Sequence, residues 1–319
     1  MTLNKNTLYW SVYKNLEREV IELSRQIHFD DNQLSVYSVK IAELLIRCSI
    51  EIESIAKELY YQNGGITPLD DGNERDLYFD TDCIELLENK WELSEKKVFV
   101  SASTFYFDKE EHQILTPLKK ANKRGKSGSD WKKAYQAVKH NRSQNLSKGN
   151  IENLIKAMGA LYLLNIYYRN DHFNLGIESR KEKFDYSLGS EVFSIKSDYV
   201  AFNDISGDID MSMNYKECVY IEKYTDDAYQ GIVLSSRNDW EKQKKALIES
   251  TEFKDFISKN PNYSFKSNQF ITVCREIGGD EFMRKMHQIK NDSIRLYINS
   301  PKEVILNKNT KVYPDIKNV

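Results

Sequence analysis

The chain has 319 residues, of which 40% are hydrophobic and 29% are charged, and its net charge is only −2. This length exceeds one average core, so two domains are expected, and the near-neutral total excludes a protein that is strongly basic or acidic throughout. No apolar run approaches the roughly 18 to 20 residues that cross a bilayer, and the first residues lack the apolar segment of a signal peptide. We therefore expect a cytoplasmic protein that does not bind a membrane.

The cysteines and the common cofactor motifs give no sign of a metal or a cofactor. Cys48, Cys83, Cys218 and Cys274 are far apart, whereas zinc ligands usually arrive in closely spaced pairs. The sequence contains no GxGxxG, GxxxxGK(S/T), GxSxG or HExxH motif. We expect structural thiols, no metal and no cofactor.

Two amphipathic helices are predicted near the start of the chain. Apolar residues recur at three- and four-residue steps over residues 8–27 and, more regularly, over residues 35–62. Gly64, Gly65 and Pro68 end the second stretch. We expect it to be the longest helix of the chain.

On this second helix, Glu51 lies beside the apolar seam and one turn from Arg47. One interpretation is an ordinary solvated ion pair between the two side chains. The other is that Glu51 reaches a cation on a different helix. Further along, residues 83–91 favour a short helix, and alternation over residues 98–107 favours a strand or an ordered loop.

The segment from Lys119 to Lys148 is strongly basic. It holds ten Lys or Arg residues and one acid, Asp130, so its net charge of +9 leaves −11 for the rest of the chain. Neutralising phosphates supplies most of the sequence-independent affinity for nucleic acid. The candidate nucleic-acid ligands are Lys119, Lys120, Lys123, Arg124, Lys126, Lys132 and Lys133. The alternative is a solvated loop over residues 121–129 that has no partner.

A helix is predicted to follow this loop over residues 131–142, with Asp130 as its N-cap. At about 100° per residue, Arg142 falls on the apolar face with Val138, and His140 lies about 160° away from Arg142. An unpaired buried charge is costly. If the helix is regular to its end, we therefore expect an inward Arg142 paired with Glu51 or with the nearby Glu53. The polar run SQNLSKGN at 143–150 also allows an earlier end near Lys139, which would bring His140 and Arg142 together.

Residues 150–168 are apolar on nearly every side and predict a core helix. The RNDH sequence at 169–172 is typical of a helix end, where cations are favoured beside the last carbonyls. A catalytic pair there is the weaker alternative.

From about residue 180 the sequence predicts a mixed α+β region. Strands are expected at 188–201, 217–224, 230–234, 271–277, 293–300 and 303–307, and helices at 240–259 and 280–290. The aspartates Asp204, Asp208 and Asp210 fit a turn better than a cation loop. The expected fold class is α+β, with a helical domain at 1–178 and an α+β domain of unknown role at 179–319.

Three stretches together give the first part of the chain a family resemblance. IRCSIEIESIAKELY (46–60), WKKAYQAVKHNR (131–142) and IENLIKAMGALYLLNIYY (151–168) resemble the HEPN superfamily of small helical domains. Members often act as metal-independent RNA endonucleases in toxin–antitoxin and phage-defence systems, including abortive infection. The pattern WxxAYxxVKHxR looks like a bacterial HEPN-like subgroup, and the resemblance covers roughly the N-terminal half.

The resemblance implies a site. His140 would be the general acid or base, Arg142 and Lys139 would stabilise phosphoryl charge, Asn141 would orient a group, and Glu51 would hold Arg142. It also implies RNA as partner, a homodimer, and an antitoxin or a phage-encoded trigger. Active nucleases of the superfamily typically carry an Arg about four to six residues before a His, and none of the five histidines here has an Arg at that offset.

The sequence leaves two other functions open. The first is a non-catalytic module that binds nucleic acid or a protein through residues 119–148. The second is a sensor subunit whose C-terminal half recognises a ligand or a phage protein.

Overall fold

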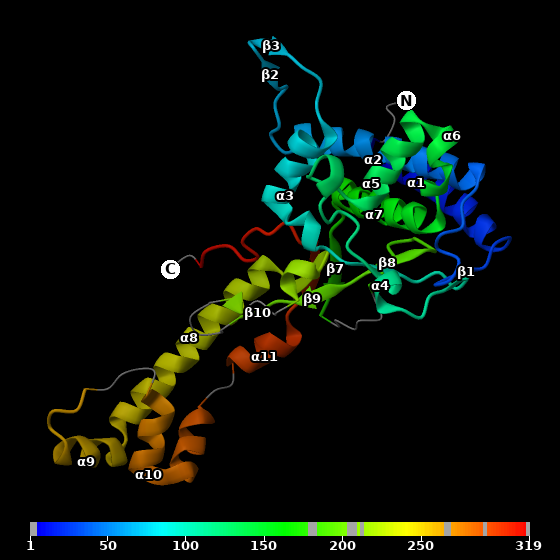
Figure 1. The fold of residues 1–319 in the computed structure, drawn as a ribbon. Helices are drawn as coiled ribbons and strands as arrows, with labels where there is room; N and C mark the ends of the chain where they lie inside the picture. The colour runs from blue at the N-terminus through cyan, green and yellow to red at the C-terminus, as the bar shows by residue number, and fades with distance from the viewer. Residues whose placement is uncertain are drawn as a thin grey trace.

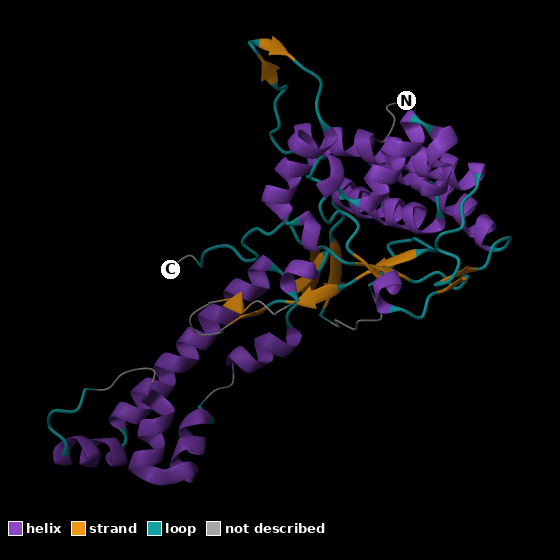
Figure 2. Ribbon diagram, in the orientation of Figure 1, coloured by secondary structure: helices purple, strands orange, loops and turns teal. Residues whose placement is uncertain are grey.

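The structure is a computed structural model that describes residues 5–177, 184–202, 209–210, 214–264, 269–289 and 292–316. The fold is α+β, as the sequence predicted, with helices gathered above a strand-rich centre and again in an extension below it (Figure 2). The expected turn at Asp204 and Asp208 lies outside the described residues.

Seven helices form most of the first part of the described chain. They are α1 (Lys5–Ser24), α2 (Val39–Gln62), α3 (Glu85–Trp91), α4 (Glu110–Gln113), α5 (Asp130–His140), α6 (Arg142–Asn145) and α7 (Ile151–Arg169). A π-helical turn, η1 (Phe79–Ile84), leads into α3. Helix α7 is buried over most of its surface because α1, α2 and α5 pack around it (Figure 1). The predicted core helix is therefore confirmed.

Helix α2 follows the sequence pattern closely. The Ser38 hydroxyl caps its start by accepting a bond from the Ile41 amide, and its predicted seam is buried from Ile41 to Leu59. Gly64, at a φ of +87°, follows the helix end. Helix α2 has 24 residues, as does α8 (Asp226–Glu249), and these two are the longest helices among the described residues.

Short strands join the helices. They are β1 (Phe29–Asp30), β2 (Leu69–Asp70), β3 (Asn73–Glu74), β4 (Val98–Val100), β5 (Phe105–Tyr106), β6 (Ile114–Leu115), β7 (Phe173–Gly176), β8 (Phe193–Ile195), β9 (Ser197–Tyr199), β10 (Ala201–Phe202), β11 (Ile209–Asp210), β12 (Tyr220–Tyr224) and β13 (Lys302–Leu306). The largest sheet among the described residues has the order β7-β13-β12-β9, and a three-stranded sheet has the order β6-β4-β8. In the first, β9 is parallel to β12 and the other pairs are antiparallel.

One hydrophobic core includes residues from both sides of position 178. Strand β4 pairs with β8, with Val98 opposite Ile195. Phe193, Tyr220 and Val304 belong to the same buried cluster as the helices of the first part. The domain division at 178–179 stays a prediction, and both segments contribute to this core.

Three predicted strands are helical instead. Residues 230–234 lie in α8, residues 271–277 lie in α10 (Phe270–His287), and residues 293–300 coincide with α11 (Asp292–Asn299). Short apolar runs fit a helix as well as a strand, so periodicity alone cannot separate the two. The start of α8 did carry a helix signal, because Thr225 caps it and two aspartates follow in the first turn.

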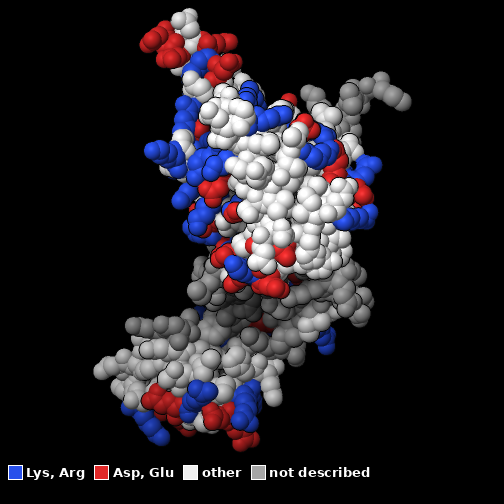
Figure 3. Space-filling view, turned by 45° about the vertical axis from the view of Figure 1, so that its right-hand side comes forward, with Lys and Arg blue, Asp and Glu red and all other residues white. Residues whose placement is uncertain are grey.

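The described C-terminal helices lead away from the sheets. Helix α8 runs outward, and α9 (Thr251–Lys259) and α10 pack at its far end around a separate small core (Figure 1). At the opposite end of the molecule the β2–β3 hairpin projects as an arm whose tip is acidic (Figure 3). No helix in the described ranges is long and apolar enough to span a membrane.

Candidate anion-binding site

Helix α5 positions most of the predicted site residues. Its buried face consists of Trp131, Ala134, Tyr135 and Val138, as the sequence periodicity predicted. Its N-cap is Ser129, whose side chain makes no capping bond. The prediction that Asp130 is the N-cap is therefore wrong by one position, because Asp130 already lies in the first helical turn.

The helix ends earlier than predicted. Asn141 has a φ of −149° and a ψ of 74°, outside the helical region, and α6 begins at Arg142. Arg142 is exposed. The expected inward Arg142, held by Glu51 or Glu53, is therefore wrong, because a helical wheel has no meaning beyond a non-helical residue.

Three other residues of the predicted catalytic group, His140, Lys139 and Asn141, are also at the surface. His140 is exposed, with its Nε2 atom 3.2 Å from the Gln136 Oε1 atom. Lys139 donates to the Tyr135 hydroxyl at 3.2 Å, and this bond raises the pKa of Lys139. The Asn141 amide donates to Gln144 one turn on. These side chains thus make local contacts.

Glu51 lies half-buried on α2, and no other described residue gives it a hydrogen bond or an ion pair. Burial raises the pKa of Glu51, and the charge of Arg47 partly opposes this rise. Arg47 itself bonds to Glu19 of α1 at 2.6 Å. Both interpretations of Glu51, as a contact partner of Arg47 or of a cation on another helix, are therefore wrong.

Two of the predicted nucleic-acid ligands, Lys132 and Arg124, bind the same carboxylate, that of Asp80. The ammonium of Lys132 lies 2.7 Å from Asp80 of η1 and also donates to the Lys123 carbonyl. Arg124 donates to the other oxygen of Asp80 at 2.8 Å and lies over the Tyr78 ring. Burial alone would raise the pKa of Asp80, but the bonds from Lys132 and Arg124 lower it below its usual value. The prediction that Lys132 is a nucleic-acid ligand does not fit this arrangement, since its ammonium is paired and only 9% of the residue is exposed.

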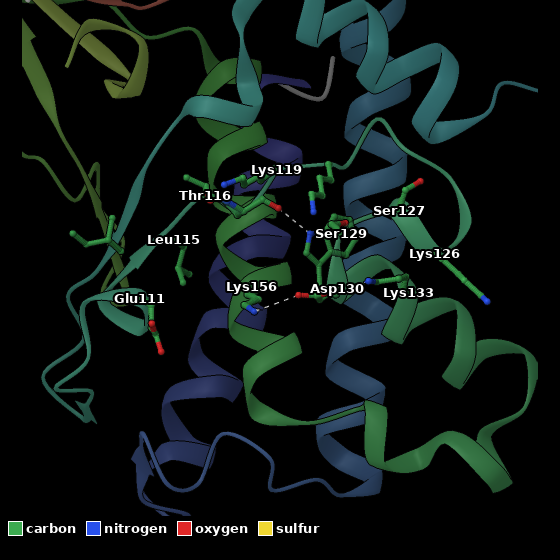
Figure 4. Close-up of a pocket in the computed structure, with 15 residues that line it drawn as sticks. Glu111, Leu115, Thr116, Lys119, Lys126, Ser127, Ser129, Asp130, Lys133 and Lys156 are labelled. Carbon is green, nitrogen blue, oxygen red and sulfur yellow. Dashed lines mark hydrogen bonds and ion pairs between the residues drawn. The ribbon is translucent and has the colours of Figure 1, made fainter. Parts of the chain in front are cut away.

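The basic segment does form a pocket next to this ion pair. Its volume is about 460 Å³, and it is bounded by the 114–120 segment, the loop before α5, the first turn of α5 and one residue of α7 (Figure 4). The lining residues with ionisable groups are Glu111, Lys119, Lys120, Lys126, Asp130, Lys133 and Lys156. Of the predicted ligands, Lys123, Arg124 and Lys132 do not line it. We refer to it below as the basic pocket.

Short polar contacts set the shape of the basic pocket. The Trp131 indole donates to the Pro117 carbonyl at 2.9 Å, which ties the 114–120 segment to α5. The Asp130 carboxylate lies 2.9 Å from Lys133 and 3.8 Å from Lys156. Gly128 is required beside α5, since an added Cβ would lie 2.9 Å from the Lys123 carbonyl oxygen.

Lys156 is the one lysine of the basic pocket that the sequence did not identify. It lies directly before Ala157 and one turn after Glu152, to which it bonds at 2.6 Å. In the sequence it is indistinguishable from an ordinary i,i+4 surface pair. Only the packing of α7 against α5 places it beside Asp130.

The basic pocket offers ammonium groups and the start of a helix, which suit an anion. The four cysteines, by contrast, are buried and form no disulfide, and burial raises the pKa of the Cys218 thiol to about 11. Within the part of the chain that the structure describes, no three His, Cys, Asp or Glu residues group as metal ligands would. A scan against protein-family models, a search of curated proteins and a search of solved structures each found no match to this chain.

Proposed function

We propose that this chain binds nucleic acid, and RNA in particular, through the basic pocket, and that it does not cleave the RNA. The observation that carries this proposal is the convergence of five lysines on one pocket at the start of α5, from the 114–120 segment, the loop before α5, α5 itself and α7. Helix starts favour negative charge, and ammonium groups there add to the same field.

The charge balance of the pocket supports an anionic partner. Its five lysines face two carboxylates, those of Glu111 and Asp130. Asp130 is engaged by Lys133 and Lys156. Among the described residues, no carboxylate pairs with Lys119, Lys120 or Lys126, so these three ammonium groups are available to phosphates.

Salt dependence tests this proposal. Fluorescence anisotropy with single-stranded RNA should show binding whose logarithmic affinity falls with the logarithm of salt concentration, with a slope of about −0.7 for each phosphate contact. Three to five contacts predict a slope between about −2 and −3.5. Binding that ignores salt, or no binding at low salt, would count against the proposal.

The metal-independent RNA endonuclease suggested by the family resemblance is a second candidate. What favours it is the end of α5 at His140, which turns Arg142 away from the core, so that both side chains reach solvent. In such a reaction the RNA 2′-hydroxyl attacks the adjacent phosphorus as the 5′-oxygen leaves. His140 would move a proton, and the cations Arg142 and Lys139 would stabilise the phosphorane. The products would carry a 2′,3′-cyclic phosphate and a 5′-hydroxyl.

The two candidates differ in their dependence on His140. Incubation of RNA with the chain in EDTA should give products with a cyclic phosphate only if the chain is a nuclease. In that case His140→Ala should abolish these products. His28→Ala is the matched control, because His28 is also exposed but lies before α2 and stacks on Tyr106. If His140→Ala cuts RNA as fast as the unaltered chain, the nuclease assignment fails. The homodimer, the antitoxin and the phage-encoded trigger stay predictions.

A further inference from the structure

The first turn of α5 opens into the basic pocket without a cap. Helix geometry leaves the amides of Asp130, Trp131 and Lys132 without intrahelical acceptors. The described residues supply no acceptor to these amides, and the N-cap side chain makes no bond to them. Asp130 and Trp131 line the pocket, so two of these backbone donors and the positive end of the helix dipole lie at its wall.

Ser129 provides a separate observation that points to a ligand. The residue lines the basic pocket, only 7% of it is exposed, and its buried hydroxyl has no hydrogen-bond partner in the described ranges. Buried hydroxyls are nearly always paired, because desolvation without a partner costs free energy. In Figure 4, Ser129 lies at the centre of the pocket, with Lys119 to one side and Lys126 at the rim on the other.

We propose that the basic pocket binds a phosphomonoester, carried either by the end of an RNA strand or by a free mononucleotide. A phosphomonoester carries up to two charges and three terminal oxygens, each of which accepts hydrogen bonds. Its acceptors match donors that approach from several directions: the Ser129 hydroxyl, the first amides of α5, and the ammonium groups of Lys119 and Lys120. A phosphodiester within a strand offers one charge and two terminal oxygens, and so satisfies fewer of them.

The size of the pocket agrees with this ligand. A volume of about 460 Å³ lies within the range of roughly 300 to 1,000 Å³ that is usual for small-ligand sites. It accommodates one nucleotide but no length of duplex. For the RNA end this inference rests on the proposed function, whereas for the free mononucleotide it stands alone.

The test compares RNA ends on the full chain. Oligonucleotides of one sequence with a 5′-phosphate, a 3′-phosphate or only hydroxyl ends are measured by anisotropy, and a 5′-mononucleotide and inorganic phosphate serve as competitors. A phosphorylated end should bind about tenfold more tightly, since a few charge-assisted hydrogen bonds are added. Preference for one of the two phosphorylated ends identifies an RNA source, and equally strong competition by the mononucleotide identifies the free ligand.

Ser129→Ala assigns the effect to this pocket. It should remove most of the preference for a phosphorylated end, whereas Ser143→Ala, at an exposed serine of α6, should leave it intact. The thermal midpoint of Ser129→Ala should not fall, because the lost hydroxyl had no partner. Asp130→Asn should strengthen binding of the phosphorylated end, since it removes a negative charge from the same turn.

The outcomes separate this inference from the proposed function. Salt-dependent RNA binding with no preference among ends would overturn the phosphomonoester site and leave nucleic-acid binding standing. If the chain binds a mononucleotide, and inorganic phosphate competes with it, but the chain binds no RNA, the phosphomonoester site stands and the proposed nucleic-acid binding is overturned. A preference that survives Ser129→Ala unchanged would place the phosphate elsewhere and overturn the assignment to this pocket.

Discussion

The ammonium of Lys132 on α5 lies 2.7 Å from a carboxylate oxygen of Asp80, and both side chains are buried. The second oxygen of Asp80 accepts a bond from Arg124 at 2.8 Å. This contact ties η1 to α5 beside the basic pocket. It also decides which cations of the basic segment remain for a ligand, because Lys132 and Arg124 are already paired.

Asp80→Ala should strongly destabilise the fold. The substitution leaves the Lys132 ammonium buried without its carboxylate, and breaking a buried pair in this way costs about 3 kcal/mol. The measurement is the free energy of unfolding from urea denaturation. Asp130→Ala is the control, because the Asp130 side chain is 65% exposed, and an exposed pair contributes less than about 1 kcal/mol. Equal losses in the two variants would show that the Asp80 pair is no more important than a surface pair.

The same contact predicts an acid-dependent loss of stability. The pKa of Asp80 is lower in the folded chain than its ordinary value, so the ionised form stabilises the fold above about pH 4, the unfolded value. This contribution falls as the pH drops below about 4, toward the folded pKa. The difference in unfolding free energy between the unaltered chain and Asp80→Asn should be constant from pH 5 to 7 and shrink below pH 4. A difference that stays constant down to pH 2.5 would contradict the assignment.

Glu51→Gln should stabilise the chain at neutral pH. Burial raises the pKa of Glu51, so its ionisation at pH 7 opposes folding, and the gain from removing the charge should vanish below about pH 4. The side chain remains partly in water, so we expect roughly a few tenths of a kcal/mol. Thermal unfolding at pH 7 and pH 4 checks the sign. A loss of stability at pH 7 would mean that Glu51 has a cationic partner after all.

The sequence predicted the helices whose apolar pattern is long. The seam of α2 and the buried face of α5 appear where periodicity placed them, and the all-round apolar α7 lies in the core. Such patterns extend over several turns, so few alternatives satisfy them. The short apolar runs at 230–234 and 271–277 lack this constraint, and both proved helical.

The site was predicted only in part, for reasons that particular residues make clear. The charge count identified the segment that contains Lys119, Lys120 and Lys126. It could not show that Lys132 points to Asp80, 52 positions away, or that Lys156 reaches Asp130 from another helix. The polar run at 143–150 allowed an early helix end, but nothing in the sequence placed the break at Asn141. Each failure is a long-range contact or a single backbone angle that local sequence does not specify.

The central claim concerns the three unpaired lysines of the basic pocket, and a pair of triple variants tests it most directly. One carries alanine at Lys119, Lys120 and Lys126, and the control carries alanine at three exposed lysines of the C-terminal helices that make no ion pair with a described residue, Lys254, Lys259 and Lys285. Both change the net charge equally, so only the location of the lost cations differs.

The measurement is the dissociation constant for single-stranded RNA across a salt series. The pocket variant should bind at least about tenfold more weakly, with a salt slope shallower by about 2, because each lost phosphate contact removes about 0.7. The control should stay within about twofold of the unaltered chain. Equal weakening in both variants, or full binding by the pocket variant, would contradict the account.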